Sequence, residues 1–374
     1  MKTLVSLFSG IGGLDEGLHN AGFTPIFCSE LDVNARSSLE NWCKRHSVDP
    51  IINPDINTIT PHSLKRELGL KVGELDLLAG GPPCQSFSLI GNRKSLEDDR
   101  GLLLYKMIEF AKVLKPKAVL IEQVKGLLSA KGADGIKGSA LKTILDDFGE
   151  LGYNASYKVL RAADYGVPQL RDRVFIVATQ KKFTFEFPEP SHFCKVKQPQ
   201  KSNLFSSELT PYLTVKDAIA DLPSPVLKGE TEEIPSHLDI TPPRDKERIN
   251  GVPEGECLAR QLHLPADQRQ RLNPEKDTTK FRRMAWDLPA LTLRGGEAFY
   301  HPTENRYLTP REYLRLHGFS DSHILSGPIR ARSGTVKNLD QHRQIANAVP
   351  PPLAEAMGNS ILLALISKKP VKVA

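Results

Sequence analysis

The chain has 374 residues, 40% of them apolar and 25% charged, which suffices for about two domains with buried cores and argues against a disordered chain. The formal net charge of +6 permits a polyanionic partner without requiring one. The longest apolar run, residues 361–366, is far too short to span a membrane, and the N-terminus lacks the apolar segment of a signal peptide. We therefore expect a cytoplasmic protein without a membrane partner.

The five cysteines do not indicate a disulfide framework or a bound metal. Their number is odd and no two form a CxxC pair, so neither a structural zinc site nor any other metal site is predicted, and a reducing compartment is expected. At most one of them needs a chemical explanation; the five are Cys28, Cys43, Cys84, Cys194 and Cys257.

Short apolar runs alternate with amphipathic stretches in the first half of the chain. The runs of strand length are 3–8, 25–30, 75–79, 118–121 and 174–178, and the helical patterns cover 13–21, 32–46, 102–114 and 141–151. This alternation predicts an α/β fold with a mostly parallel sheet flanked by helices. Ligands of such sheets bind at the carboxyl ends of the strands, so functional residues are expected directly after each strand.

Charge and proline content change along the chain. Residues 1–180 have a net charge of +1, residues 181–290 have a net charge of 0 and hold 13 of the 28 prolines, and residues 291–374 have a net charge of +5. The proline-dense middle segment predicts an irregular insertion or a smaller separate domain.

The first strand is followed by the glycine-rich sequence FSGIGG, residues 8–13. Glycines allow the backbone to approach a ligand at a helix N-terminus, although a plain tight turn has the same composition. Glu30 ends the second strand, 20 residues after Gly10, where a carboxylate can accept hydrogen bonds from ribose hydroxyls. Because the loop is not GxGxxG, an adenosine cofactor without a pyrophosphate is favoured over a nicotinamide dinucleotide.

The sequence GGPPCQSFS, residues 80–88, follows another strand. An inert core residue is the usual interpretation of a cysteine, and it fits the other four. Two prolines stiffen the chain before Cys84, and a Gly-Pro loop at the carboxyl end of a strand does not suit a core residue. The position predicts a nucleophile that faces a cleft.

Three later segments carry polar side chains at the ends of predicted elements. Glu122 ends the next strand, where a carboxylate is either an ion-pair partner or a general acid. Arg171 and Arg173 enter the last strand, either as a solvated rim or as ligands of a phosphate or a base carbonyl. The sequence QIANAVP, residues 344–350, opens a C-terminal helix, for which a cap and a proline start are the simplest interpretation.

In this order, and over nearly the whole chain, the segments resemble the motifs of the cytosine-C5 DNA methyltransferase family. SGIGG resembles the cofactor loop, and Glu30 with PDI at 54–56 resembles the ribose and adenine contacts. PCQ at 83–85, EQV at 122–124 and QLRDR at 169–173 resemble the nucleophile, acid and QxRxR motifs. RYLTPRE at 306–312 and NAVP at 347–350 resemble the segment after the recognition region and the closing motif.

The resemblance implies a Rossmann-like methyltransferase fold with three segments. Residues 1–180 would form the catalytic and cofactor-binding domain, residues 181–290 a smaller irregular target-recognition domain, and residues 291–374 the part that returns to complete the catalytic domain. S-adenosylmethionine would be the methyl donor and double-stranded DNA the substrate. The protein would act as a monomer, either beside a separate restriction endonuclease or as a solitary bacterial enzyme.

The same resemblance implies a role for each matching residue. In this chemistry Cys84 adds to carbon 6 of a flipped-out cytosine, Glu122 holds a proton at ring N3, and Arg173 contacts the base O2. The implied catalytic residues are Pro83, Cys84, Gln85, Glu122, Arg171 and Arg173. The implied cofactor contacts are Phe8, Ser9, Gly10, Ile11, Gly12, Gly13, Glu30, Leu31, Asp55, Ile56, Gly80, Pro82, Asn347 and Ala348.

A basic cluster lies at the end of the implied recognition region. Residues 260–283 carry a net charge of +4 within a neutral segment, and as a cluster they are expected to contact phosphates and guanines. For any single residue, a solvated helical face is the simpler interpretation. The implied DNA contacts are Ser88, Arg260, Arg269, Arg271, Lys276, Lys280, Arg282 and Arg283.

Two residues depart from the family pattern. Gln123 stands where the family usually has Asn, which moves the amide out by one methylene, and Ala346 stands where it usually has Gly, which matters if the backbone needs a positive φ. Two alternative functions remain. A tRNA cytosine-5 methyltransferase belongs to the same family but usually differs after the Cys-Gln pair, and a catalytically silent binding protein would typically have lost Cys84 or Glu122.

Overall fold

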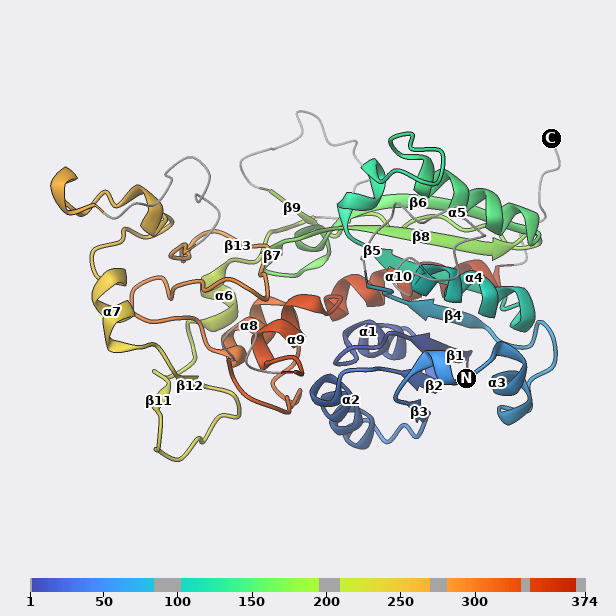
Figure 1. The fold of residues 1–374 in the computed structure, drawn as a ribbon, viewed down its shortest axis with the longest axis horizontal. Helices are drawn as coiled ribbons and strands as arrows, with labels where there is room; N and C mark the ends of the chain where they lie inside the picture. Colours follow the sequence, from blue (N-terminus) through green and yellow to red (C-terminus); the bar gives the residue numbers. More distant parts are fainter. Residues whose placement is uncertain (1, 84–101, 195–208, 270–280, 331–336, 368–374) are drawn as a thin grey trace. The chain divides into compact units, whose positions relative to one another are not determined.

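The computed structural model of the protein describes residues 2–83, 102–194, 209–269, 281–330 and 337–367. The chain divides into two compact units (Figure 1). The larger unit comprises Met1–Arg161, Asp172–Glu189 and Val349–Ala374, and the smaller unit comprises Ala162–Arg171 and Pro190–Ala348. The division predicted at residues 180 and 290 concerns which residues bind the cofactor and which read DNA, and it stays a prediction.

A seven-stranded sheet forms the centre of the larger unit. Its strand order is β3-β2-β1-β4-β5-β8-β6, and β8 runs antiparallel to both of its neighbours while the other pairs are parallel. The mostly parallel sheet predicted from the sequence is therefore confirmed. The strands are β1 (Lys2–Leu7), β2 (Phe23–Ser29), β3 (Ile51–Asn53), β4 (Leu77–Gly80), β5 (Ala118–Gln123), β6 (Tyr153–Arg161) and β8 (Asp172–Gln180).

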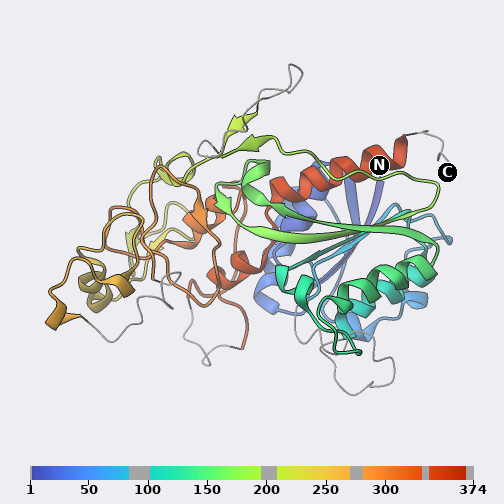
Figure 2. The same cartoon turned by 90° about the horizontal axis from the view of Figure 1, so that it is seen from above.

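Helices cover both faces of this sheet. In the view along the sheet, α10 (Pro351–Ile366) lies on one side, and α4 (Leu102–Leu114) and α5 (Ser139–Glu150) lie on the other (Figure 2). Alternate residues of β1 and β5, including Val5, Leu7 and Val119, pack in one apolar core with buried residues of α4 and α5. The remaining helices of the unit are α1 (Gly13–Asn20), α2 (Val33–Arg45) and α3 (Pro61–Glu67).

Two glycines allow α1 and α10 to pack closely. A Cβ atom on Gly17 would lie 2.3 Å from the carbonyl oxygen of Pro351, and one on Gly358 would lie 2.6 Å from the Cβ atom of Ala21. The C-terminal helix therefore belongs to the core of the larger unit.

The order of the strands locates the ligand-binding edge. The chain moves from β1 outward to β3 and then returns to place β4 on the other side of β1, so the topological switch lies between β1 and β4. Ligands of open α/β sheets bind beside such a switch, at the carboxyl ends of the strands. The loops after β1, β2, β4 and β5 all leave from this edge.

The smaller unit has little regular structure. It contains the two-residue strands β7 (Gln169–Leu170), β9 (His192–Phe193), β10 (Thr210–Pro211), β11 (Val226–Leu227), β12 (Leu238–Asp239) and β13 (Ala290–Leu291) and the short helices α6 (Val215–Ile219), α7 (Pro243–Ile249), α8 (Pro310–Leu316) and α9 (Gln341–Asn347). One of its apolar clusters consists of only five buried residues, Ile249, Val252, Leu258, Ala298 and Tyr300.

One helical stretch in the described part of the chain, Gln341–Ile366, is long and apolar enough to cross a membrane by length and composition alone. It consists of α9 and α10, which are interrupted at Ala348–Pro350. Of its most apolar window, 56% is buried inside the protein, as in the core helix of a globular protein.

Candidate active site

An ion pair between Glu122 and Arg173 lies at the carboxyl end of β5. The antiparallel register of β5 and β8 places the last residues of β5 beside the first residues of β8. Arg173 Nε lies 2.8 Å from Glu122 Oε1, and the two side chains are only 12% and 11% exposed. Arg173 Nη1 also donates to the carbonyl oxygen of Asp172 at 2.9 Å. Two residues that the sequence placed 51 positions apart are thus in direct contact.

The chain that leads to Cys84 begins beside this ion pair. A Cβ atom on Gly81 would lie 3.3 Å from Glu122 Oε2, and one on Gly80 would lie 2.6 Å from the carbonyl oxygen of Leu7. Position 80 therefore needs glycine, and a side chain at position 81 would crowd the Glu122 carboxyl. Pro83 is exposed, whereas Cys84, Gln85 and Ser88 lie outside the described residues.

Gln123 connects the acid motif to the same loop. Its side chain is buried, and Nε2 donates to the carbonyl oxygen of Pro82 at 2.5 Å. No partner for its Oε1 is found among the described residues. The longer amide side chain therefore reaches the backbone of the nucleophile loop despite the departure from Asn.

The loop after β1 adopts a conformation that needs its glycines. Gly10 has φ +58° and Gly12 has φ +87°, and the helix α1 begins at Gly13. The loop is fixed to β2, because Ser9 N donates to the carbonyl oxygen of Ser29 at 2.9 Å and Gly10 N donates to Glu30 Oε2 at 2.8 Å. The glycine loop after β1 and Glu30 after β2, both predicted to bind the cofactor, are therefore in direct contact.

The surroundings of Glu30 fit an adenosine group. Its Oε1 accepts a hydrogen bond from Asp32 N at 2.9 Å, so each carboxylate oxygen is oriented by one backbone N–H. Burial raises the pKa of Glu30 above its ordinary value. The next residue, Leu31, is 71% exposed and offers an apolar surface, and the space beyond Gly10 is open.

The other predicted cofactor residues of the larger unit occupy two kinds of position. Phe8 (φ 59°), Asp55 and Gly80 lie at strand or loop ends on the ligand-binding edge, where Asp55 Oδ1 accepts from Asn57 N at 2.9 Å. Ile11 and Ile56 are buried, at 0% and 5% exposure, so their side chains pack in the protein interior and anchor the loops to which they belong.

A buried carboxyl group that the sequence did not single out lies under the cofactor loop. Asp15 belongs to the first turn of α1, is fully buried, and accepts a weak hydrogen bond from Cys28 Sγ at 3.6 Å. No partner for its Oδ2 is found among the described residues. Burial raises the pKa of Asp15 to about 6.

Arg171 is embedded in the smaller unit. It is 1% exposed, and its Nη2 donates to the carbonyl oxygens of Ala346 at 2.7 Å and Ala348 at 3.0 Å. Its hydrogen bonds thus hold the closing segment, which suits a structural role better than the catalytic role inferred from the resemblance. Asn347 is exposed and Ala346 is helical, so the usual glycine is not required there by a positive φ.

The basic residues of the smaller unit divide by exposure. Arg260 and Arg269 are exposed, and Arg260 pairs with Glu256 at 3.0 Å. Arg282 is half-buried and donates to the carbonyl oxygen of Gly255. Arg271, Lys276 and Lys280 lie outside the described residues.

Arg283 is buried, and its two terminal nitrogens donate only to residues of the same unit. It is 4% exposed and donates to the carbonyl oxygens of His301, Pro302, Glu304 and Ile249 and to Asn305 Oδ1, at 2.8 to 3.3 Å. Burial lowers its pKa. No partner for its Nε is found among the described residues, but a guanidinium that is 4% exposed offers little surface to a phosphate, so burial argues against the DNA contact expected of Arg283.

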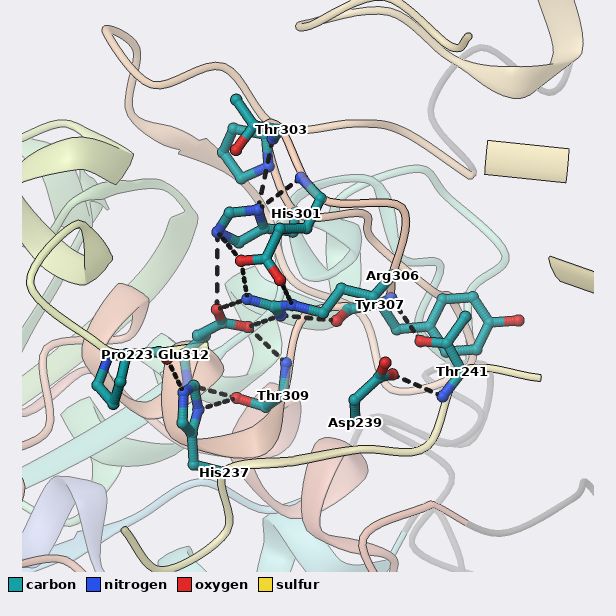
Figure 3. Close-up of polar contacts among 12 residues, drawn as sticks. Pro223, His237, Asp239, Thr241, His301, Thr303, Arg306, Tyr307, Thr309 and Glu312 are labelled. Carbon is teal, nitrogen blue, oxygen red and sulfur yellow. Dashed lines mark hydrogen bonds and ion pairs between the residues drawn. The ribbon is translucent and has the colours of Figure 1, made fainter. Parts of the chain in front are cut away.

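A second arginine orders the same unit through carboxylates. Arg306 forms two-pronged pairs with Glu312, at 2.8 and 2.9 Å, and with Glu304, at 3.0 and 3.1 Å (Figure 3). Thr309 N donates to Glu312 Oε2 at 2.7 Å, which completes a capping box at the start of α8. Although burial opposes it, the contacts with Glu312 and Glu304 raise the pKa of Arg306.

His301 lies above this pair (Figure 3). Its Nδ1 accepts from the backbone N–H groups of Glu304 at 3.0 Å and Thr303 at 3.4 Å, so the ring proton belongs on Nε2, which faces Glu304 and Glu312. Burial, and then the charge of Arg306, lower the pKa of His301 to about 4. The imidazole is therefore neutral at ordinary pH.

The sequence missed the polar contacts that order the smaller unit. The spacing of RYLTPRE carried a signal, because Thr309 followed three residues later by Glu312 is a capping-box pattern. Nothing in the sequence indicated that Arg283 is buried, since a basic residue within a basic cluster is normally exposed.

Comparison with known proteins decides the family. The family model for C-5 cytosine-specific DNA methylases matches residues 2–363. The chain belongs to this family. Among similar curated proteins, the type II methyltransferase M.AquIA of Picosynechococcus sp. is 41% identical over 231 residues, which cover 59% of this chain and 89% of that protein. The type II methyltransferase M.AgeI of Thalassovita gelatinovora is 30% identical, over 98% of this chain and 100% of that protein.

Solved structures show the same fold. A DNA modification methyltransferase encoded within an E. coli prophage aligns with a TM-score of 0.69 at 21% identity and covers 98% of this chain and 100% of its own. Dnmt2 methyltransferase of S. pombe aligns with a TM-score of 0.58 at 18% identity, over 98% and 100%. The predicted Rossmann-like methyltransferase fold is confirmed. The protein is thus a DNA (cytosine-5-)-methyltransferase that uses S-adenosylmethionine.

Proposed function

We propose that this methyltransferase modifies carbon 5 of a cytosine that is flipped out of a specific double-stranded DNA sequence, through a covalent bond between Cys84 and carbon 6. The observation that supports this best is the 2.8 Å contact between Glu122 and Arg173 beside Gly81, three residues before Cys84. The reaction needs an acid, a charge stabiliser and a nucleophile, the roles proposed for Glu122, Arg173 and Cys84.

Each side chain has a separate task in this proposal. Carbon 5 of cytosine is a poor nucleophile, and addition of the Cys84 thiolate to carbon 6 turns the ring into an enamine. Glu122 donates a proton or a hydrogen bond to ring N3 during the addition, and Arg173 holds the Glu122 carboxyl and contacts the base O2. After carbon 5 has accepted the methyl group, its proton passes to a solvent base, Cys84 leaves as a thiolate and the N3 proton returns to Glu122, which regenerates the enzyme.

The backbone that leads into the nucleophile loop, residues 80–82, is fixed by contacts with β1 and β5. Gln123 fixes the carbonyl of Pro82, and the glycines at 80 and 81 let the loop pass close to Leu7 and Glu122. We propose that Pro83 and Gln85 complete this loop. A loop that is fixed before the substrate arrives lowers the cost of placing Cys84 next to the ring.

The loops after β1 and β2 hold the cofactor in this proposal. Residues 8–13 provide backbone N–H groups at the start of α1, Glu30 accepts hydrogen bonds from the ribose, and Leu31, Asp55 and Ile56 surround the adenine. When bound, S-adenosylmethionine supplies the sulfonium methyl group. The contacts inferred for Gly80, Pro82, Asn347 and Ala348 are part of the same proposal.

The smaller unit reads DNA in this proposal. Arg260, Arg269 and Arg282 are the described candidates for phosphate or guanine contacts, and Ser88, Arg271, Lys276 and Lys280 are proposed with them. Curated relatives are type II methyltransferases, which supports a restriction-modification role with a separate endonuclease. We further propose a monomeric enzyme that acts in the cytoplasm.

The experiment that tests the function is bisulfite sequencing of DNA from cells that express the chain. Protected cytosines in one recurring sequence would support the proposal and identify the target. Random or absent protection, together with methyl transfer into tRNA in vitro, would contradict it.

A further inference from the structure

Three charged side chains meet where β5, β6 and β8 come together at the edge that carries Glu122. Asp172 Oδ1 lies 2.8 Å from Arg161 Nε, and Asp172 Oδ2 lies 3.2 Å from Arg161 Nη2 and 3.0 Å from Lys125 Nζ. Arg161 is the last residue of β6, Asp172 is the first residue of β8, and Lys125 follows β5. One carboxylate therefore ties three segments together.

The backbone of Asp172 continues this connection to the catalytic pair. Its carbonyl oxygen accepts from Arg173 Nη1 at 2.9 Å, while Arg173 Nε contacts Glu122 Oε1 at 2.8 Å. The guanidinium is thus held between Asp172 and Glu122. A movement at the start of β8 would change the direction in which Arg173 presents its donors.

We propose that Asp172 is a positioning residue for methyl transfer, which fixes the start of β8 through Arg161 and Lys125 so that Arg173 and Glu122 keep their mutual geometry. This inference rests on the proposed roles of Glu122 and Arg173. Asp172 does not touch the reacting atoms.

The exposure of the cluster favours this role over a contribution to stability. The side chains of Lys125, Arg161 and Asp172 are 55%, 43% and 20% exposed, and ion pairs at such exposure add little to the folding free energy. The hydrogen bonds from Arg161, and then those from Lys125, lower the pKa of Asp172, so the carboxylate is charged whenever the enzyme works. The two-pronged contact with Arg161 fixes direction as well as distance.

A competing interpretation treats Lys125 and Arg161 as phosphate ligands whose charge Asp172 moderates. The two cations and one carboxylate of the cluster have a net charge of one positive unit. Removing the carboxylate would then strengthen DNA binding and leave the chemical step unchanged. The positioning role therefore predicts a lower kcat with an unchanged KM for DNA, whereas the competing interpretation predicts a lower KM with an unchanged kcat.

The test is Asp172→Asn in the full-length enzyme, with the rate measured in single turnovers at saturating duplex DNA. We expect the rate to fall by ~10-fold to ~100-fold, which is the usual cost of a small misplacement, with the KM for DNA within ~2-fold and cofactor affinity unchanged. Asp172→Glu keeps the charge and should restore part of the rate. Arg161→Gln should reproduce the loss, and it serves as the second variant if Asp172→Asn does not fold.

A matched control and a double mutant complete the design. Glu109→Gln removes the partly exposed ion pair between Glu109 and Lys106 on α4, in which Nζ and Oε2 lie 3.3 Å apart, and should leave every parameter unchanged. In an Arg173→Lys background, Asp172→Asn should cost less than ~3-fold, because the residue through which it acts is already altered. An unchanged rate for Asp172→Asn, an additive loss in the double mutant, or an altered KM for DNA alone would overturn the inference.

Glu122→Gln separates this inference from the proposed function. If Glu122→Gln is inactive while Asp172→Asn matches the wild type, only the positioning role fails. If Glu122→Gln is fully active, the proposed function itself fails.

Discussion

Gln123 Nε2 donates to the carbonyl oxygen of Pro82 at 2.5 Å, so a buried amide on β5 holds the backbone two residues before the nucleophile. The contact joins the acid motif to the Cys84 loop through one side chain. It also explains how Gln serves at a position where the family usually has Asn, because the additional methylene lets the amide reach the carbonyl.

We predict that Gln123→Leu lowers the rate of methyl transfer by ~10-fold or more without loss of cofactor binding. The substitution leaves the buried carbonyl of Pro82 without its donor, at a cost of about 1–3 kcal/mol. Single-turnover kinetics and calorimetric titration with S-adenosylmethionine measure the two quantities. Gln123→Asn keeps an amide with a shorter reach and should be intermediate, so an Asn variant less active than the Leu variant would contradict the assignment.

We predict that Glu122→Gln lowers kcat by ~10²-fold to ~10⁴-fold, the usual contribution of a general acid, while DNA binding persists. Gln keeps the size of the side chain and can still accept from Arg173, but it cannot transfer a proton to ring N3. Rapid-quench methylation assays and gel-shift titrations with duplex DNA check the two parts. Equal losses of DNA affinity and of rate would point to disruption of the edge as a whole.

The exposed Arg260 and the buried Arg283 of the basic cluster should affect different properties when they are replaced, DNA binding and stability respectively. Arg260→Gln should weaken DNA binding and reduce the slope of log affinity against log salt concentration by about 1, because it removes one phosphate contact, while stability stays within ~1 kcal/mol. Filter-binding assays over a range of salt concentrations and urea denaturation measure the two effects. An unchanged salt slope would remove Arg260 from the DNA surface.

Arg283→Lys should instead destabilise the smaller unit by about 3 kcal/mol, because a lysine ammonium cannot satisfy the five oxygen acceptors that now share one guanidinium. Urea denaturation monitored by Trp286 fluorescence would report the change. A stable Arg283→Lys variant with reduced DNA affinity would restore the role that the sequence suggested.

Asp15 makes stability depend on pH in a direction that can be tested. Its pKa is raised from 3.8 to about 6 by burial, so the folded protein keeps this proton while the unfolded chain loses it. This difference in proton binding lowers the free energy of unfolding. The loss is absent below pH 3.8, grows between pH 3.8 and about pH 6, and reaches about 3 kcal/mol above pH 6. Asp15→Asn removes the titration, so its stability relative to the wild type should increase from pH 4 to pH 7. Calorimetry at several pH values checks this, and a difference that does not vary with pH would contradict it.

The sequence predicted the larger unit well because its signals are local. Apolar runs predicted β1, β2, β4, β5 and β8, and the glycine and proline loops marked the edge at which they end. It missed β6 (Tyr153–Arg161), an edge strand in which only Tyr153 and Leu160 are fully buried and which forms no apolar run. It also missed β3, which has only three residues.

Contacts between distant segments were beyond the reach of the sequence. Glu122 and Arg173 were both proposed as site residues, but only the pairing of β5 with β8 shows that they touch. Arg171 and Arg173 are two residues apart in one motif, yet one orders the closing segment and the other holds the acid. Arg283 and Arg260 belong to one basic cluster, and burial alone separates their roles.

The central claim is that Cys84 forms a covalent bond with the target base, and trapping with 5-fluorocytosine tests it most directly. Fluorine at carbon 5 cannot leave as a proton does, so the enzyme should remain attached to duplex DNA that carries the analogue at the target site. We predict a denaturation-resistant adduct, dependent on S-adenosylmethionine and located at Cys84 by mass spectrometry, and none with Cys84→Ser. A methylating enzyme that forms no adduct, or a Cys84→Ala variant with full activity, would contradict the account.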